Sequence, residues 1–306
     1  MSRGFSPREP DDARRGVPTP ADRPVHGDGR DTEFSRIDGA SQAAERISDR
    51  THENGSPEIQ PPDGRGVYYD RDRGYRLNDS EVRTIAELGR FRVIAYHDLA
   101  QHAYGGRQDQ AGADLQNLIR KGLVRRGTFE GPEATPRELL TLTRRGHRLV
   151  RAGRMVPQDQ AIYHGFVKPR EANHDADLYL LYQKEAARIE KEGGRSLRIV
   201  LDYELKRKVN RDIARFGTTA RKEIAERHGL RVVRNKIPIP DMRIEYETRE
   251  GDMARVNLEL VTEHYRGRSV AEKVRAGFAL YTPHGEADHL RRVLDQQELT
   301  AEILSL

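Results

Sequence analysis

The pattern that most restricts the fold lies in residues 77–151, where three helical segments are followed by two short β-type runs. Asn78 can accept a hydrogen bond from a free backbone N–H at the start of the first helix, and Glu81 can reach back to the cap. Apolar residues then recur at helical spacing as far as Gly89, where we expect this helix to end. The other two helical segments are residues 96–104 and 109–121.

A β-hairpin is expected after these helices. Residues 123–126 and 139–142 have the composition of two short strands, and residues 127–138 hold two glycines and two prolines, which suit a hairpin tip. Thr143 can cap a last short helix. Three helices followed by a hairpin is the order of a winged helix-turn-helix, so we expect that fold for residues 77–152. Such domains bind DNA in some proteins and other proteins in others, and both alternatives stay open here.

The charge of this region favours DNA. Residues 107–151 carry ten Arg or Lys against five Asp or Glu. Amide and guanidinium groups on the outer face of the third helix can read adenine and guanine edges, while basic residues at the helix end and hairpin can hold phosphates. The candidate DNA-contacting residues are Gln110, Gln116, Asn117, Arg120, Lys121, Arg125, Arg126, Arg137, Arg144 and Arg145.

Composition narrows the class of protein further. The chain has no cysteine, which excludes disulfides, cysteine zinc sites, iron–sulfur clusters and thiol catalysis. No apolar run approaches the roughly 20 residues of a membrane span, so we expect a cytoplasmic protein without a membrane partner. Residues 1–76 hold eight of the fifteen prolines and lack apolar periodicity, which predicts a disordered tail.

The second half is expected to be an α/β domain, which makes the whole chain α+β. Residues 153–173 have little pattern and are expected to form a linker. Asp175 can then cap a helix at the start of a domain spanning residues 174–306. The pattern after it predicts strands and helices in the order β–α–β–β–α–α, with strands at 196–201, 242–246 and 254–261, a helix at 269–281 and a last helix within 286–306.

Two carboxylates in this domain are candidates for chemistry. Asp241 opens one predicted strand and Glu259 lies in the next, so both could lie at the same end of a hairpin. This layout resembles the PD-(D/E)xK nuclease core, in which Asp and Glu hold Mg²⁺ and a lysine two residues after Glu stabilises the phosphate. Magnesium needs few protein carboxylates besides water. Val261 stands at the lysine position, so we expect weak cleavage or none. Glu204 is a candidate third ligand or a solvated residue.

A more particular resemblance joins the two halves. The expected winged helix, followed by "HDADL", "IPIPD" and "NLELVTEHYRGRSVAEKV", resembles the replication-relaxation family of plasmid and integrative-element proteins over about residues 77–285. The resemblance implies a nuclease-like C-terminal domain in which Asp241, Glu259 and Lys273 correspond to the site, with His174 at the head of the first helix. The family often has an aspartate where Val261 stands.

These observations predict a DNA-binding protein of a bacterial mobile element that needs no cofactor. Its expected partners are double-stranded DNA, a second copy of the chain in a homodimer, and replication or transfer proteins. One alternative is an Mg²⁺-dependent DNA endonuclease that uses Asp241, Glu259 and Lys273. The other is a protein-interaction adaptor. The candidate site also has a plainer interpretation, in which Glu259 and Lys273 are an ordinary surface pair. Carboxylates of Asp241 and Glu259 within about 5 Å, faced by Lys273, would favour the enzyme.

Overall fold

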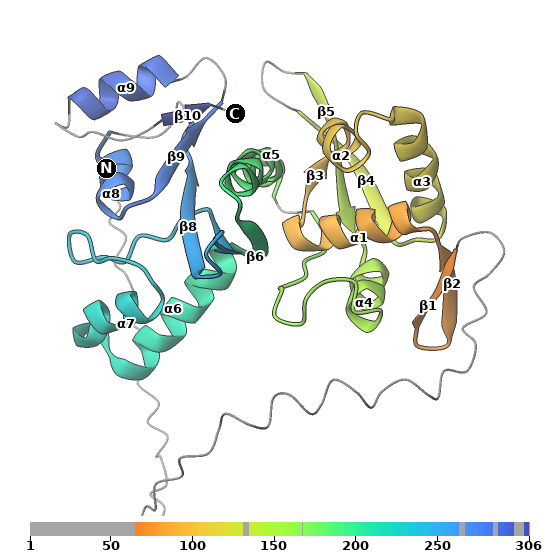
Figure 1. The fold of residues 1–306 in the computed structure, drawn as a ribbon, viewed down its shortest axis with the longest axis horizontal. Helices are drawn as coiled ribbons and strands as arrows, with labels where there is room; N and C mark the ends of the chain where they lie inside the picture. The colour runs from red at the N-terminus through yellow and green to blue at the C-terminus, as the bar shows by residue number, and fades with distance from the viewer. Residues whose placement is uncertain are drawn as a thin grey trace, which may run out of the picture. The chain divides into compact units, whose positions relative to one another are not determined.

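A computed structural model describes residues 65–130, 135–166, 168–262, 267–283, 287–296 and 303–305. They form a mixed α/β structure, as expected, with one two-stranded, one three-stranded and one five-stranded sheet among the described residues (Figure 1). Residues 1–64, which hold most of the predicted tail, lie outside the described residues. No helix in the described ranges combines the length and apolar character needed to cross a membrane.

The first described element corrects the boundary of the predicted tail. β1 (Gly66–Asp70) and β2 (Arg73–Leu77) pair as an antiparallel hairpin. Tyr75 and Leu77 of this hairpin are buried in the main apolar cluster. The tail prediction placed residues up to 76 outside the folded part because the strands are short and their apolar residues are few.

α1 (Asp79–Phe91) begins where the sequence predicts. Asn78 and Glu81 form both hydrogen bonds of a capping box. The predicted end at Gly89 is wrong, because the helix continues to Phe91. Gly89 serves packing instead: a Cβ there would lie 3.0 Å from the side chain of Ile162, and its carbonyl accepts a hydrogen bond from the Tyr163 N–H.

The next elements follow the predicted order of helices and strands. The helices are α2 (Tyr96–Ala103), α3 (Gln108–Arg120) and α4 (Arg144–Ala152), and the strands are β3 (Ile94–Ala95), β4 (Val124–Glu130) and β5 (Pro136–Leu142). The three strands form an antiparallel sheet in the order β3-β5-β4. Thr143 caps α4 by accepting from the Gly146 N–H. Most of the predicted hairpin tip, residues 131–134, lies outside the described residues.

The segment predicted as a linker, residues 153–173, contacts the strand at residues 195–201 through Gln160. The amide of Gln160 donates to the carbonyl of Ile199 and accepts from its N–H, at 2.9 and 3.0 Å, as a neighbouring strand would. α5 (Pro169–Lys191) also starts earlier than expected, with proline in its first turn. Asp175 is therefore a buried residue inside the helix and not its cap.

The five-stranded sheet has the order β10-β9-β8-β7-β6 (Figure 1). Its antiparallel part consists of β6 (Arg195–Leu201), β7 (Met242–Glu247) and β8 (Met253–Leu260). β9 (Ala279–Thr282) pairs with β8 in parallel, and β10 (Ile303–Ser305) pairs with β9 in parallel. The helices of this region are α6 (Asp202–Phe216), α7 (Arg221–Arg227), α8 (Gly267–Arg275) and α9 (Ala287–Asp295), with a short 3₁₀ turn at Thr218–Ala220.

Three predictions for this region are wrong. The one helix expected between β6 and β7 was at residues 219–227, and α6, whose buried apolar residues are only Leu205 and Val209, was not predicted. Residues 279–282 form β9 and not the end of a helix, because Gly277, at φ 81°, turns the chain after α8. The last described residues, 303–305, form a strand beside β9 where a helix was expected.

Close packing at the start of α4 gives a test of the fold. A Cβ at Gly146 would lie 2.2 Å from the backbone oxygen of Leu123. We expect Gly146→Ala to lower the free energy of unfolding by about 1–3 kcal/mol through overpacking, although alanine favours helix by about 1 kcal/mol. Gly112→Ala in α3 is the control, because the nearest atom there is the Tyr96 hydroxyl at 3.6 Å.

Urea unfolding followed by circular dichroism measures both variants. Gly112→Ala should raise the free energy of unfolding by up to about 1 kcal/mol. Equal stabilisation by the two substitutions would contradict the close approach of α4 to Leu123.

Candidate functional site

Asp241 and Glu259 lie side by side at one end of the β7–β8 pair. Met242 pairs with Leu258, which places the residue before β7 opposite the penultimate residue of β8. The Asp241 N–H donates to Glu259 Oε2 at 3.3 Å, and the Leu260 N–H donates to Asp241 Oδ2 at 2.9 Å. The two carboxylates predicted from the strand pattern are therefore neighbours.

Lys273 reaches the same place from α8. Its ammonium lies 2.6 Å from Glu259 Oε1 and donates to the carbonyl of Ile239 at 2.7 Å. The Glu259 side chain is fully buried, whereas those of Lys273 and Asp241 are 18% and 17% exposed. A buried carboxylate needs a counter-charge, which the Lys273 ammonium supplies.

His174 of α5 completes the cluster. Its Nε2 lies 3.6 Å from Asp241 Oδ1. Burial alone would lower the pKa of His174, but the Asp241 carboxylate beside it and the charge of Asp175 outweigh burial and raise the pKa to about 9. Burial raises the pKa of Asp175 to about 6 and also raises that of Asp202, with a contribution from the Asp241 charge. His174 is therefore a cation at neutral pH.

The carboxylates have the chemistry of magnesium ligands but do not form a larger acidic group. Asp241 and Glu259 could supply one oxygen each to an ion that keeps its remaining ligands as water. Among the described residues, no group of three or more His, Cys, Asp or Glu is arranged to hold a metal ion. Glu204, the candidate third ligand, instead pairs with Arg198 at 2.5 Å and Lys208 at 2.6 Å.

Val261, at the position where the nuclease pattern has lysine, belongs to a separate apolar cluster. It is 3% exposed and packs with Val270, Leu280 and two leucines of α9. A cation at this position would have to be buried. The ammonium near Glu259 comes from Lys273 instead, fourteen residues further along the chain.

The proposed DNA-contacting residues divide into two groups. Gln116, Arg120, Arg125 and Arg144 are exposed, with no ion pair to any described residue, and Arg125 lies over the Phe166 ring. Gln110 is exposed and near Ser80, Arg145 is half-buried, and Arg126 is exposed, 3.6 Å from Glu138 and over the Tyr96 ring. These seven side chains remain candidates for DNA contact.

Three of the predicted contacts are used inside the protein. The Asn117 amide donates to the buried carboxylate of Glu81, which ties α3 to α1. Lys121 donates to the carbonyl of Arg76 at 2.6 Å and lies 3.7 Å from Glu81. These two side chains point to α1 and β2 because Glu81 is buried there and needs donors.

Arg137 is the third such residue. It pairs with Asp177 of α5 at 2.6 Å and with Asp98 of α2 at 3.0 Å, and its side chain is 19% exposed. Asn117, Lys121 and Arg137 therefore hold elements of this chain together, and their role as DNA contacts stays a prediction. Asp98 and Asp177 lie 39 and 40 residues from Arg137, so no local sequence pattern could have revealed the pairs.

No family model, curated protein or solved structure matches this chain. The function is therefore inferred from the geometry of the two sites and from the sequence.

The His174–Asp241 contact predicts a measurable titration. In EDTA-containing buffer, NMR of the histidine ring should give His174 a pKa of about 9 in the folded protein. Asp241→Asn removes the largest of the contributions that raise the pKa, so the pKa should fall well below that of the wild type, with burial opposed only by the charges of Asp175 and Asp177.

The same shift predicts the pH dependence of stability. The pKa of His174 is higher in the folded protein than in the unfolded chain, so protonated His174 stabilises the fold. This stabilisation is fully present below the unfolded-state pKa of about 6.5 and is lost as the pH rises through the folded-state pKa of about 9. Asp241→Asn should reduce this loss of stability. A His174 pKa at or below 6.5 in the wild type would contradict the contact.

Proposed function

We propose that this chain binds double-stranded DNA, with α3 against base edges and the basic residues beside it against phosphates. The observation that supports this proposal most is the exposed face of α3, where Gln116 and Arg120 are free of ion pairs to described residues. Amide and guanidinium groups are the side chains that read adenine and guanine in the major groove.

The surroundings of α3 suit the phosphate backbone. Arg144 at the start of α4 and Arg125 on β4 are exposed, and the three-helix and hairpin order is that of a winged helix-turn-helix. The resemblance to replication-relaxation proteins supports a site on plasmid or integrative-element DNA. The role that fits this reading is control of replication, transfer or transcription.

Substitutions on α3 separate DNA contacts from structural residues. Gln116→Ala and Arg120→Ala should each weaken binding to the specific site by about 1–3 kcal/mol without lowering the melting temperature. Asn117→Ala is the matched control on the same helix. It should lower the free energy of unfolding by about 1–3 kcal/mol, because the buried Glu81 carboxylate loses a donor.

The measurement is a binding titration on duplexes selected by the purified chain, beside thermal unfolding of each variant. Affinity should fall steeply with salt, roughly one unit of log–log slope for each phosphate contact. Full affinity in both Gln116→Ala and Arg120→Ala would show that α3 does not contact the DNA bases. If the wild-type chain has no affinity for duplex DNA even at low salt, the alternative of a protein-interaction adaptor is favoured.

A second candidate function is Mg²⁺-dependent cleavage of DNA. The observation that favours it is the convergence of Asp241, Glu259 and Lys273. Weak cleavage was expected because Val261 cannot supply a cation, but Lys273 brings an ammonium to the same carboxylates. A magnesium ion held by the two carboxylates would stabilise charge on a phosphodiester. The Lys273 ammonium lies beside Glu259 and is partly exposed, so it can also donate to a phosphate oxygen. His174 holds Asp241 in place through its charge.

Nicking of supercoiled plasmid tests this candidate. If the cluster is catalytic, the wild type should nick with Mg²⁺ or Mn²⁺, and Glu259→Gln and Lys273→Met should each lower the rate by about 10²–10³. Lys222→Met on α7 is the control, because Lys222 is exposed and far along the chain from the cluster. A wild type that binds duplex but leaves the plasmid supercoiled would reduce the cluster to a structural ion pair.

A further inference from the structure

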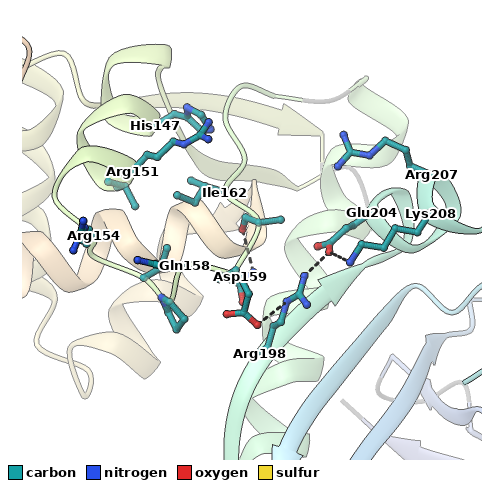
Figure 2. A pocket seen from close by; sticks show the side chains of 15 residues that line it. His147, Arg151, Arg154, Gln158, Asp159, Ile162, Arg198, Glu204, Arg207 and Lys208 are labelled. Atoms are coloured by element: carbon teal, nitrogen blue, oxygen red, sulfur yellow. Dashed lines mark hydrogen bonds and ion pairs between the residues drawn. The ribbon is translucent and has the colours of Figure 1, made fainter. Parts of the chain in front are cut away.

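A cavity of about 730 Å³ lies away from both sites described above, between α4, the segment after it, β6 and α6 (Figure 2). Its lining is strongly basic. The cations are Arg151, Arg154, Arg198, Arg207 and Lys208, and the carboxylates are Asp159 and Glu204. Five cations against two carboxylates leave an excess of three positive charges.

Two of the five cations are neutralised within the wall. Arg198 lies 2.5 Å from Glu204 and 3.7 Å from Asp159, and Lys208 lies 2.6 Å from Glu204 (Figure 2). Glu204 is buried, so these pairs form a fixed floor. Their charges are already compensated before any ligand arrives.

The excess charge therefore belongs to Arg151, Arg154 and Arg207. None of the three forms an ion pair with any residue in the described ranges, and all three are exposed. They come from different elements, since Arg151 lies in the last turn of α4, Arg154 follows the helix and Arg207 lies on α6. Like charges around one cavity repel each other, and an anion between them would relieve the repulsion.

The backbone at Arg154 supports a role for its side chain. Its φ is +49°, in the left-handed region, just after the C-cap of α4. Glycine adopts this conformation without the steric cost of about 1 kcal/mol that other residues meet. A glycine would fit this backbone conformation better than arginine. The arginine places a guanidinium at the cavity, which a glycine could not do.

The lining also indicates the chemistry of the ligand. The lining residues in the described ranges include no phenylalanine or tyrosine ring on which a base could stack. Guanidinium groups bind phosphate through paired N–H donors. We propose that this cavity is a phosphate-binding site, separate from the α3 surface, that holds phosphate groups of a free oligophosphate or of a nucleic-acid backbone through Arg151, Arg154 and Arg207.

Calorimetry of the full chain with sodium tripolyphosphate is the first test. We expect binding by the wild type and a loss of about a hundredfold in Arg151→Ala/Arg207→Ala, since each charged contact contributes about tenfold. Arg154→Glu should also abolish binding. Arg211→Ala is the matched control, because Arg211 is exposed on α6, as Arg207 is, but does not line the cavity. Circular dichroism confirms that each variant is folded.

Duplex and single-stranded oligonucleotides form the second arm and identify the source of the phosphate. Tripolyphosphate binding that only the cavity variants lose, with duplex affinity unchanged, supports a free oligophosphate. Weaker oligonucleotide binding in the cavity variants, with Arg211→Ala unaffected, supports a nucleic-acid backbone. The proposal is overturned if neither probe responds to the cavity variants, or if Arg211→Ala loses as much as they do.

Discussion

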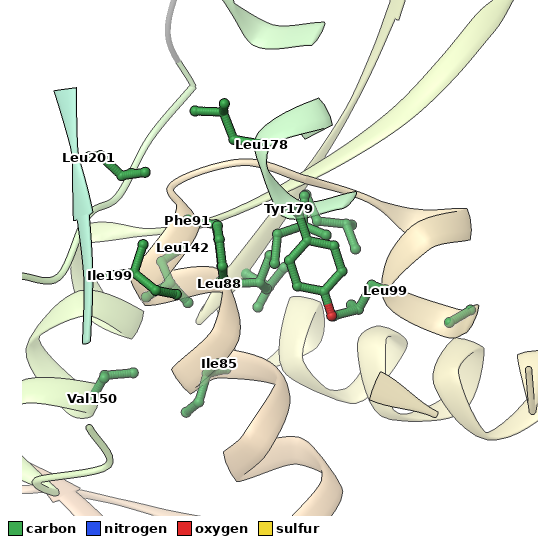
Figure 3. Packing of buried hydrophobic residues seen from close by; sticks show 14 of the residues in the cluster. Ile85, Leu88, Phe91, Leu99, Leu142, Val150, Leu178, Tyr179, Ile199 and Leu201 are labelled. Atoms are coloured by element: carbon green, nitrogen blue, oxygen red, sulfur yellow. The ribbon is translucent and has the colours of Figure 1, made fainter. Parts of the chain in front are cut away.

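The burial of α5 on two of its faces is the interaction on which the rest of the structure depends. Ala176 packs with the residues around β3, and the Tyr179 ring meets Phe91 edge-on at 5.1 Å (Figure 3). On its other side, α5 contacts β6, β7 and β8 and contributes Leu178 and Leu181 to the same core. A helix that is apolar on two faces must be covered on both. One apolar cluster therefore runs from β2 to β9.

The first turns of α5 carry the polar consequence of this packing. His174 pairs with Asp241 of the candidate catalytic cluster, and Asp177, three residues later, pairs with Arg137 of β5. Both pairs are fixed by one rigid helix whose position is set by its apolar faces. The geometry around Asp241 thus depends on the helices and strands before α5, against which α5 packs, as well as on the five-stranded sheet. Those earlier elements contribute no carboxylate to the cluster.

Local patterns in the sequence predicted part of this structure. The Asn78–Glu81 capping box and the Thr143 cap are short-range signals, and both appear. The pairing of Asp241 with Glu259 followed from two strands joined by a short turn. The partner of Asn117 could not be predicted, because Glu81 lies 36 residues away and its burial is a tertiary property. α6 was missed because charged residues outnumber its apolar ones.

The change from a lysine on the strand to a lysine on the following helix has a physical explanation. Val261 donates its N–H to Tyr281 beside β9 and lies in an apolar cluster, where an ammonium would be desolvated. On α8, the Lys273 ammonium lies 5.5 Å from the Phe278 ring and remains partly exposed. It compensates the buried charge of Glu259 and still faces solvent. Any phosphate that approaches must therefore compete with Glu259 for the same ammonium, which limits how much of its charge is left for catalysis.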